Sequence, residues 1–333
     1  MKIKLSSIVR IAISLGLLGF LFWLMRDDLG GLWGTLISCR GQFLILAAVL
    51  LIVNVTILSY RLKIIFLGEN LSITLNKSAQ LSFIGYFFNN FMPTAIGGDI
   101  IKAYYAGNDN NKKVESYASV LMDRLIGLYS YLIIAAVALI LDGGRFQVPV
   151  VRPLAFTLLV LGFAGFAIII NPGMRHFIEK VFRKLKMFRL GEKLESIYNI
   201  VHDYRNRKRI VLEGLIVSII AQCVYFSIIY IFFLALGAKI SIGNIFLIMP
   251  VVTFISMIPS IGGLGVREGA MVALFTPLVG KETAFASSLL FLCGLIFVSF
   301  IGGVIYLWWG FSGARKVKEA KAEIAEIEEH HDQ

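Results

Sequence analysis

Residues 210–236 read IVLEGLIVSIIAQCVYFSIIYIFFLAL, and this run of 27 residues holds a single charged side chain, Glu213. A helix needs about 20 apolar residues to cross the hydrocarbon core of a bilayer, which is about 30 Å thick. Backbone that faces hydrocarbon must satisfy its own hydrogen bonds, and a continuous apolar run lacks the alternation of a membrane β-barrel strand. The run therefore predicts a membrane-spanning α-helix.

The composition of the whole chain extends this prediction. Hydrophobic residues make up 58% of the 333 residues and charged residues only 16%, whereas soluble globular chains carry about 25% charged residues. A soluble fold of this size has too little interior to bury that much apolar surface. We expect an all-α polytopic membrane protein. A single transmembrane domain would occupy residues 1–312. A charged cytoplasmic tail at 313–333 would be a short helix or disordered.

Six apolar windows are long enough to be full spans. At the first window, Lys2, Lys4 and Arg10 precede an apolar run from Ile11 to Met25 that resembles a signal peptide, but the run ends at Arg26 without a small-x-small cleavage site. We therefore favour an uncleaved first helix. The expected spans are residues 8–25, 43–64, 119–141, 154–171, 210–236 and 285–309.

Two further apolar stretches are interrupted by proline and glycine. Residues 79–92 lead into PTAIGGD at 93–99, and residues 242–258 lead into PSIGG at 259–263. Short helical segments follow each break, at 100–106 and 266–278. We expect two re-entrant helical hairpins, which are tolerated only where they are buried in protein or line a wet cavity. The predicted turn residues are Pro93, Gly97, Gly98, Pro259, Ser260, Gly262, Gly263 and Gly265.

The net charge of +11 is unevenly distributed between alternate loops. With the N-terminus inside, most lysines and arginines fall on the cytoplasmic side, which is the usual bias of membrane proteins. We expect a bacterial or archaeal cytoplasmic (inner) membrane protein with both termini cytoplasmic. Loop charge accounts for the basic balance, so nucleic acid is not an expected partner. The basic segment 175–209 is amphipathic and would lie along the inner leaflet, or else form a solvated linker.

The order of the predicted elements repeats. Span, span, broken hairpin and span cover residues 8–141, and the same order covers residues 154–309. The first unit starts inside and the second starts outside, so the two hairpins would enter from opposite faces. An inverted-topology repeat with a midplane site built from discontinuous helices is common among secondary transporters.

Ionisable and amide side chains cluster near the two hairpins. Charges at membrane depth are costly, so they are paired or line a water-filled path, and they are candidates for function. The first turns of the short helices offer free N–H groups that suit a phosphate. Arg61 is read as an ordinary positive-inside anchor, and the tyrosines of the spans as packing or lipid-facing residues. The candidate lipid- or substrate-binding residues are Asn89, Asn90, Asp99, Lys102, Asp123, Arg124, Arg267 and Glu268.

Three motifs in order resemble a known family. Asn90-x-x-Pro93-x-x-x-Gly97-Gly98-Asp99, Asp123-Arg124-x-x-Gly127 and Pro259-Ser260-x-Gly262-Gly263-Leu264-Gly265-x-Arg267-Glu268 are similar to the lysylphosphatidylglycerol synthase transmembrane region, the flippase-like or UPF0104 family. The resemblance covers residues 8–312. It implies a lipid-handling domain, which in the lysyl-lipid synthases moves the aminoacylated lipid between leaflets. The aminoacyl-transferase domain of those synthases is not expected here, and Lys102 stands where the family usually has arginine.

These observations lead to one functional expectation with alternatives. We expect a protein that flips an anionic phospholipid or a polyprenyl-linked glycan between leaflets. It could instead be a membrane accessory subunit that presents a lipid-linked substrate to a separate glycosyltransferase or synthase, or an ion-coupled transporter of a small soluble anion. No catalytic motif is present, so no enzyme activity, cofactor or metal is expected. A second copy of the chain or a glycosyltransferase is the expected protein partner.

Overall fold

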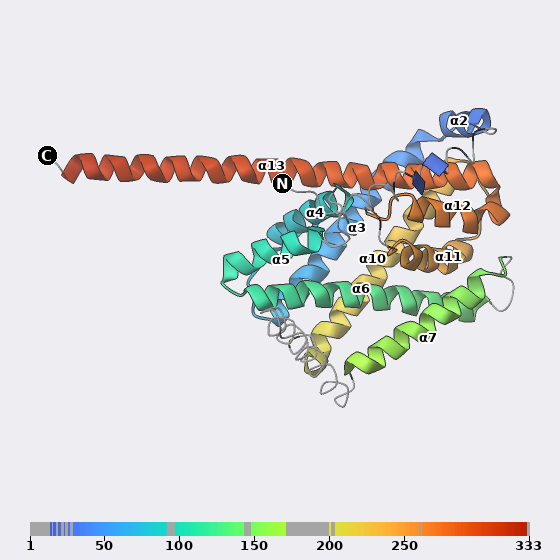
Figure 1. Cartoon of the computed structure of the whole chain (residues 1–333), viewed down its shortest axis with the longest axis horizontal. Helices are drawn as coiled ribbons and strands as arrows, with labels where there is room; N and C mark the ends of the chain where they lie inside the picture. The colour runs from blue at the N-terminus through green and yellow to red at the C-terminus, as the bar shows by residue number, and fades with distance from the viewer. Residues whose placement is uncertain are drawn as a thin grey trace.

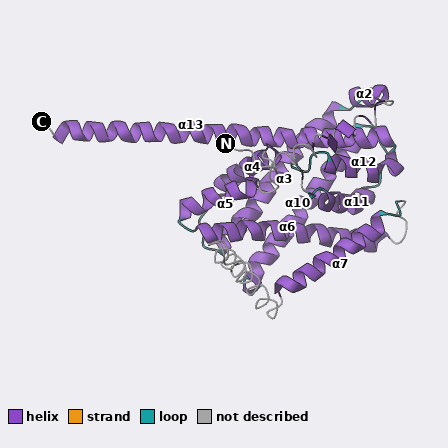
Figure 2. Cartoon of the chain, viewed as in Figure 1, coloured by secondary structure: helices purple, strands orange, loops and turns teal. Residues whose placement is uncertain are grey.

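The computed structural model describes residues 29–91, 97–142, 148–170, 204–258 and 262–331, with residues 200 and 260 and a few single positions between 14 and 26. The described part is helical and contains no strand (Figure 2). The expected all-α class is therefore confirmed. The elements are α2 (Leu29–Ile37), α3 (Gly41–Gly68), α4 (Leu75–Phe91), α5 (Gly97–Asn110), α6 (Lys113–Asp142), α7 (Val151–Ile170), the 3-10 turn η2 (Tyr204–Asn206), α10 (Lys208–Ala235), α11 (Ile242–Ile255), α12 (Val266–Val279) and α13 (Lys281–His331).

Four of the described helices are long and apolar enough to cross a membrane: α3, α6, α10 and α13. They coincide with four of the six predicted spans. The predicted span at residues 154–171 corresponds to α7, whose described apolar stretch Val151–Gly165 is shorter than a full span. The predicted first span at 8–25 and the amphipathic segment 175–209 lie largely outside the described residues.

Two features differ from the loops and tail expected from the sequence. Residues 29–37, in the connection between the predicted spans 8–25 and 43–64, form the helix α2, because Leu32 on this short apolar helix packs with Val272 and Phe285. The charged C-terminal segment is not separated from the last span. The helix α13 continues to His331 and projects well beyond the bundle (Figure 1).

Both broken hairpins are present as pairs of short helices. The first is α4 and α5, separated by residues 92–96, and the second is α11 and α12, separated by residues 256–265. Residues 92–96, which include Pro93, lie outside the described residues, as do Pro259 and Ile261. The described helices on either side agree with the predicted interruptions.

The helices of the two predicted repeats pack in matching ways. If α3, α4, α5 and α6 are paired with α10, α11, α12 and α13, neighbours in one half have counterparts in the other. For example, α4 packs against α13 while α11 packs against α6, and α3 crosses α10 in the most extensive contact of the bundle (Figure 1). A duplication would produce this arrangement. The orientation of each half in the membrane stays a prediction.

Close backbone contacts fix the first hairpin and the central crossing. Gly302 of α13 lies against the Phe83 carbonyl of α4, where an added Cβ would overlap the oxygen. Asn54 of α3 donates from Nδ2 to the Ala221 carbonyl of α10 at 2.6 Å. A small residue permits close approach, and a buried amide must find a partner, so both contacts make the helix positions specific.

Candidate functional site

A cluster of three ionisable side chains lies where the first hairpin meets α6. Asp99 is in the first turn of α5, Lys102 lies one turn later, and Arg124 is on α6. Arg124 Nη1 is 3.0 Å from Asp99 Oδ2, and Lys102 Nζ is 3.5 Å from Asp99 Oδ1. The side chains are partly accessible, from 34% exposed for Arg124 to 14% for Lys102. One carboxylate therefore holds two cationic groups close together.

Asp123 belongs to a different and more deeply buried pair. Arg61 on α3 donates from Nε to Asp123 Oδ1 at 2.7 Å and from Nη2 to Oδ2 at 2.9 Å. Its Nη1 donates to Ser218 Oγ of α10 at 2.8 Å. Gly127 makes room for the guanidinium, since a Cβ there would lie 3.1 Å from Nη1. Arg61 is only 6% exposed, so its interpretation as a surface anchor was wrong: it ties α3, α6 and α10 together.

Arg267 and Glu268 form the second ionic site, at the start of α12. Arg267 donates to Glu268 Oε1 from Nε at 3.0 Å and from Nη2 at 2.5 Å. The other carboxylate oxygen accepts the Gly265 N–H at 2.6 Å, which caps the helix. Arg267 also donates from Nη1 to the Gly262 carbonyl at 3.3 Å and lies over the Phe291 ring, 5.1 Å from its centroid. Glu268 is 0% exposed, so this pair is sealed.

The tips of the two hairpins meet inside the bundle. A Cβ on Gly262 would lie 2.9 Å from Asn90 Oδ1 and 3.1 Å from the Asn89 carbonyl oxygen. Asn89 Oδ1 accepts the Gly98 N–H at 2.8 Å and so holds the start of α5. Asn90 Nδ2 donates to Ser299 Oγ of α13 at 2.6 Å. The predicted asparagines therefore connect both turns and the last span.

The glycines of the two turns are needed for different reasons. Gly98 packs against the Gly85 carbonyl of α4, where a Cβ would overlap that oxygen. In the second turn φ is 56° at Gly262, 80° at Gly263 and 81° at Gly265, and such angles strain any residue with a Cβ. The other described turn residues have local roles. Gly97 begins α5, and Ser260 Oγ donates to the Ile258 carbonyl at 3.1 Å.

Three half-buried tyrosines lie between the two ionic sites. Tyr86 of α4 interacts electrostatically with Asp99 and with the Arg61–Asp123 pair. Tyr131 of α6 interacts with Tyr86 and hydrogen-bonds Gln222 and Thr253. Tyr225 of α10 interacts with Tyr131 and with the Arg267–Glu268 pair, and its ring contacts Phe291 at 5.4 Å between centroids. Tyr131 and Tyr225 also lie against the same Phe226 ring, at 5.9 and 6.0 Å between centroids, so we describe the three phenols as a tyrosine row between the two ionic sites.

Sequence reasoning missed this row, although a signal was present. Polar side chains recur at helical spacing within otherwise apolar helices, which places each set on one face. One set is Tyr86, Asn89 and Asn90 on α4. The others are Asp123 and Tyr131 on α6, with Gly127 between them on the same face, and Ser218, Gln222 and Tyr225 on α10. We interpreted the tyrosines as packing residues from their type alone. That interpretation overlooked the helical spacing that places them on the same helix faces as the charged residues.

The fold and the site together define a class of protein. It is a helical membrane protein in which two discontinuous hairpins bring ionised groups into an apolar bundle. Among the described residues, no three His, Cys, Asp or Glu side chains lie together as metal ligands would.

Comparison with known proteins identifies the family. The family model described as the lysylphosphatidylglycerol synthase TM region matches residues 7–302, and the chain belongs to this family. It is 27% identical over 300 residues to a UPF0104 membrane protein of Pyrococcus horikoshii, covering 80% of this chain and 87% of that protein. It is also 26% identical over 330 residues to a UPF0104 membrane protein of Methanothermobacter thermautotrophicus, covering 91% and 92% respectively. The predicted family is therefore confirmed, and the protein is a membrane protein.

Proposed function

We propose that the protein translocates the head group of an anionic phospholipid or a lipid-linked glycan between the leaflets of the membrane. One observation carries the proposal. The Asp99 carboxylate holds Arg124 and Lys102 together, 3.0 and 3.5 Å away, in a partly accessible position beside a discontinuous helix. Two cations held at this spacing can contact the same phosphate, and arginine offers paired donors suited to phosphate oxygens.

The arrangement suggests how the head group is accepted. A phosphate that approaches the first hairpin replaces Asp99 as the partner of Arg124 and Lys102. The 3.5 Å contact of Lys102 is longer than the 2.7–2.9 Å typical of charge-assisted hydrogen bonds. Lys102 is therefore the more easily drawn to the ligand. The start of α5 adds backbone N–H groups, although Asn89 already accepts that of Gly98.

The row of tyrosines provides the continuation of the path. Tyr86, Tyr131 and Tyr225 offer hydroxyl groups that can accept and donate hydrogen bonds, and they lead toward Arg267 and Glu268. The sealed second site would have to open for the head group to leave. Access to one site while the other is closed fits alternating access between two repeats.

The test is the transfer of lipid between leaflets in reconstituted vesicles. Vesicles would contain phosphatidylglycerol with a labelled head group, and its arrival in the opposite leaflet would be followed with an impermeant reagent. Asp99→Asn and Arg124→Gln should each slow transfer strongly. Asp109→Asn is the matched control, because Asp109 pairs with Lys77 on the surface and its side chain is 52% exposed.

Two results would contradict the proposal. If both variants transfer lipid at the rate of the unmodified protein, the cluster is structural. If the unmodified protein binds phosphatidylglycerol without transferring it, under every ion and pH gradient applied, a presenting role replaces translocation.

A further inference from the structure

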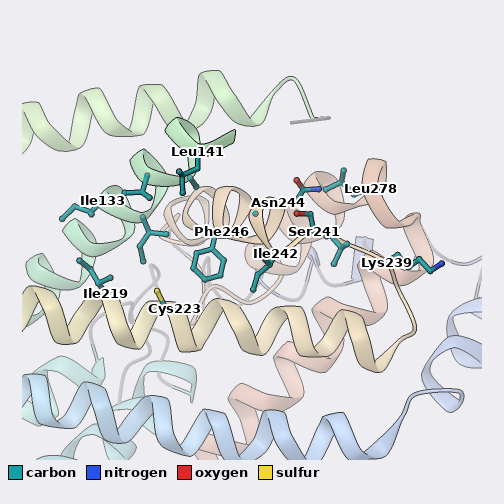
Figure 3. A pocket seen from close by; sticks show the side chains of 15 residues that line it. Ile133, Leu141, Ile219, Cys223, Lys239, Ser241, Ile242, Asn244, Phe246 and Leu278 are labelled. Atoms are coloured by element: carbon teal, nitrogen blue, oxygen red, sulfur yellow. The ribbon is translucent and has the colours of Figure 1, made fainter. Parts of the chain in front are cut away.

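A cavity of about 890 Å³ lies between α6, α10 and α11, outside the ionic sites described above. Its walls are mainly apolar side chains, with Ile133 and Leu141 from α6, Ile219 and Cys223 from α10, and Phe246 from α11 (Figure 3). Leu141 is 80% exposed and Ile242 is 49% exposed, so the cavity is a groove on the side of the bundle. Two of its walls, α6 and α10, are helices long and apolar enough to span the membrane.

The polar groups of the groove gather at one end. Lys239, Ser241 and Asn244 line it near the start of α11, and in Figure 3 they lie at the end opposite Ile133, Ile219 and Cys223. Lys239 is exposed and provides a cation there. An apolar channel with a cation at its mouth matches a molecule with a long hydrocarbon chain and an anionic head.

The length of the groove fits one leaflet. Ile133 and Leu141 mark its extent on α6, and eight residues of helix rise about 12 Å. Half of the hydrocarbon core of a bilayer is about 15 Å. A chain in the groove would therefore reach from the membrane surface to near the midplane.

The inner end of the groove adjoins the tyrosine row. Ile134 and Ala138 of the groove lie one and two turns beyond Tyr131 on the same face of α6. Phe246 of the groove packs edge-on against Phe226, whose ring centroid is 5.9 Å from that of Tyr131. The groove and the polar path are neighbours, separated by aromatic rings.

We propose that this groove binds one hydrocarbon chain of an anionic membrane lipid, whose phosphate lies at Lys239. The occupant is a lipid of the leaflet that contains the α10–α11 loop. This site does not depend on translocation, because it requires only the groove and the lysine. It would hold lipid even if the protein served to present lipid and not to move it.

Two native cysteines can report whether lipid occupies the groove. Cys223 lines the groove, whereas Cys293 is exposed on α13, and both thiols are free. The full-length protein in neutral-detergent micelles would be alkylated with N-ethylmaleimide while phosphatidylglycerol or phosphatidylcholine is added, and each cysteine would be followed by mass spectrometry. At about ten times its Kd, bound phosphatidylglycerol should slow alkylation of Cys223 about tenfold. Alkylation of Cys293 should not change.

Two variants with one matched control make the test specific. Val137→Trp places a large ring in the groove and should reduce the protection by phosphatidylglycerol. Val160→Trp on α7 is the control, because Val160 is similarly exposed, 52% against 49% for Val137, and is not part of the lining. Lys239→Gln should remove the preference for phosphatidylglycerol over phosphatidylcholine.

Several outcomes would overturn the proposal. Equal slowing of Cys223 and Cys293 would mean that the lipid acts on the micelle and not on the groove. Equal protection by both lipids in the unmodified protein would remove the head-group contact at Lys239. Undiminished protection in Val137→Trp would place the lipid elsewhere. Failure of lipid transfer with Cys223 protection retained would contradict the proposed function alone, and leave the groove in place.

Discussion

The two hairpins contain ionic sites that differ in accessibility and in stoichiometry. At the first, one carboxylate is shared by Lys102 and Arg124, and the side chains are 14–34% exposed. At the second, Arg267 and Glu268 pair one to one, at 9% and 0% exposure. The second pair also caps its own helix through the Gly265 N–H. The first hairpin therefore carries a partly accessible ionic site, and the second carries one that is closed by its own partners.

The difference indicates which site can exchange partners. A buried ion pair repays its desolvation only if both members stay together, and removal of one leaves an uncompensated charge. In this conformation the members of the Arg267–Glu268 pair therefore cannot exchange partners. The Asp99 cluster is partly solvated, so a phosphate could enter without exposing a buried charge to hydrocarbon. On the proposed function, the ligand would enter at the first hairpin and the second hairpin would stay closed.

If the ligand enters from one face of the membrane and is closed off from the other, the two halves must have opposite orientations. Thiol labelling tests this orientation directly. In a background without the three native cysteines, Asn108→Cys in α5 should be shielded from an impermeant reagent applied to intact cells. Val150→Cys, just before α7 and exposed in the structure, should be labelled. Labelling of both positions after permeabilisation is the control. Labelling at residue 108 from outside would remove the inverted orientation, and with it the assignment of entry to one face.

Arg267→Gln should have the largest effect on stability. It leaves the fully buried Glu268 without its cation, which costs about 3–5 kcal/mol. Thermal unfolding of the detergent-solubilised protein would measure the loss. The double variant Arg267→Gln with Glu268→Gln should recover part of it, because no buried charge remains unpaired. A double variant less stable than the single one would show that Glu268 is held mainly by the Gly265 N–H and other groups.

Gly98→Val should abolish lipid transfer while the protein still inserts in the membrane. The Cβ of any other residue would overlap the Gly85 carbonyl, so α5 must move away from α4 and carry Asp99 with it. Gly165→Val on α7 is the control, since nothing lies within 4 Å of a Cβ built there. Transfer at the normal rate in Gly98→Val would mean that this close approach is not needed for function.

Arg124→Lys should slow lipid transfer by about 10- to 150-fold, because a lost hydrogen bond to a charged group is worth about 1.5–3 kcal/mol and about 1.4 kcal/mol corresponds to tenfold. The charge remains, but the planar fork that matches a phosphate is gone. Arg61→Lys offers the contrast within the same bundle. It should lower the thermal stability and leave the transfer rate of the folded fraction nearly unchanged. The reason is that Arg61 binds Asp123 and Ser218 and is not part of the Asp99 cluster.

The sequence allowed the fold class, four of the six predicted spans and both hairpin interruptions to be predicted, because long apolar runs and Pro/Gly breaks are local signals. It also drew attention to Asp99, Arg124 and Arg267 as candidates, since charges in apolar runs are conspicuous, and their role in function stays a prediction. Partners could not be predicted in the same way. Asp123 and Arg124 are adjacent in the chain but point to different elements, and the partner of Asp123 is 62 residues away at Arg61. Only the packing of α3 against α6 determines that choice.

Lys102→Gln should have the smallest effect, and it sharpens the comparison within the first site. The contact with Asp99 is long at 3.5 Å, and partly solvated ion pairs contribute about 0–1 kcal/mol. An ion pair of Lys102 with the phosphate should be equally weak, so its loss should slow lipid transfer only about two- to threefold, well below the effect at Arg124. Lys113→Gln is the control for a change of net charge, because Lys113 is exposed at the start of α6.

If Lys102→Gln slows transfer as strongly as Arg124→Gln, the lysine is the principal phosphate ligand and Asp99 serves to position it. Lys102→Arg would then be expected to exceed the rate of the unmodified protein, since a guanidinium would add the bidentate contact that the lysine lacks.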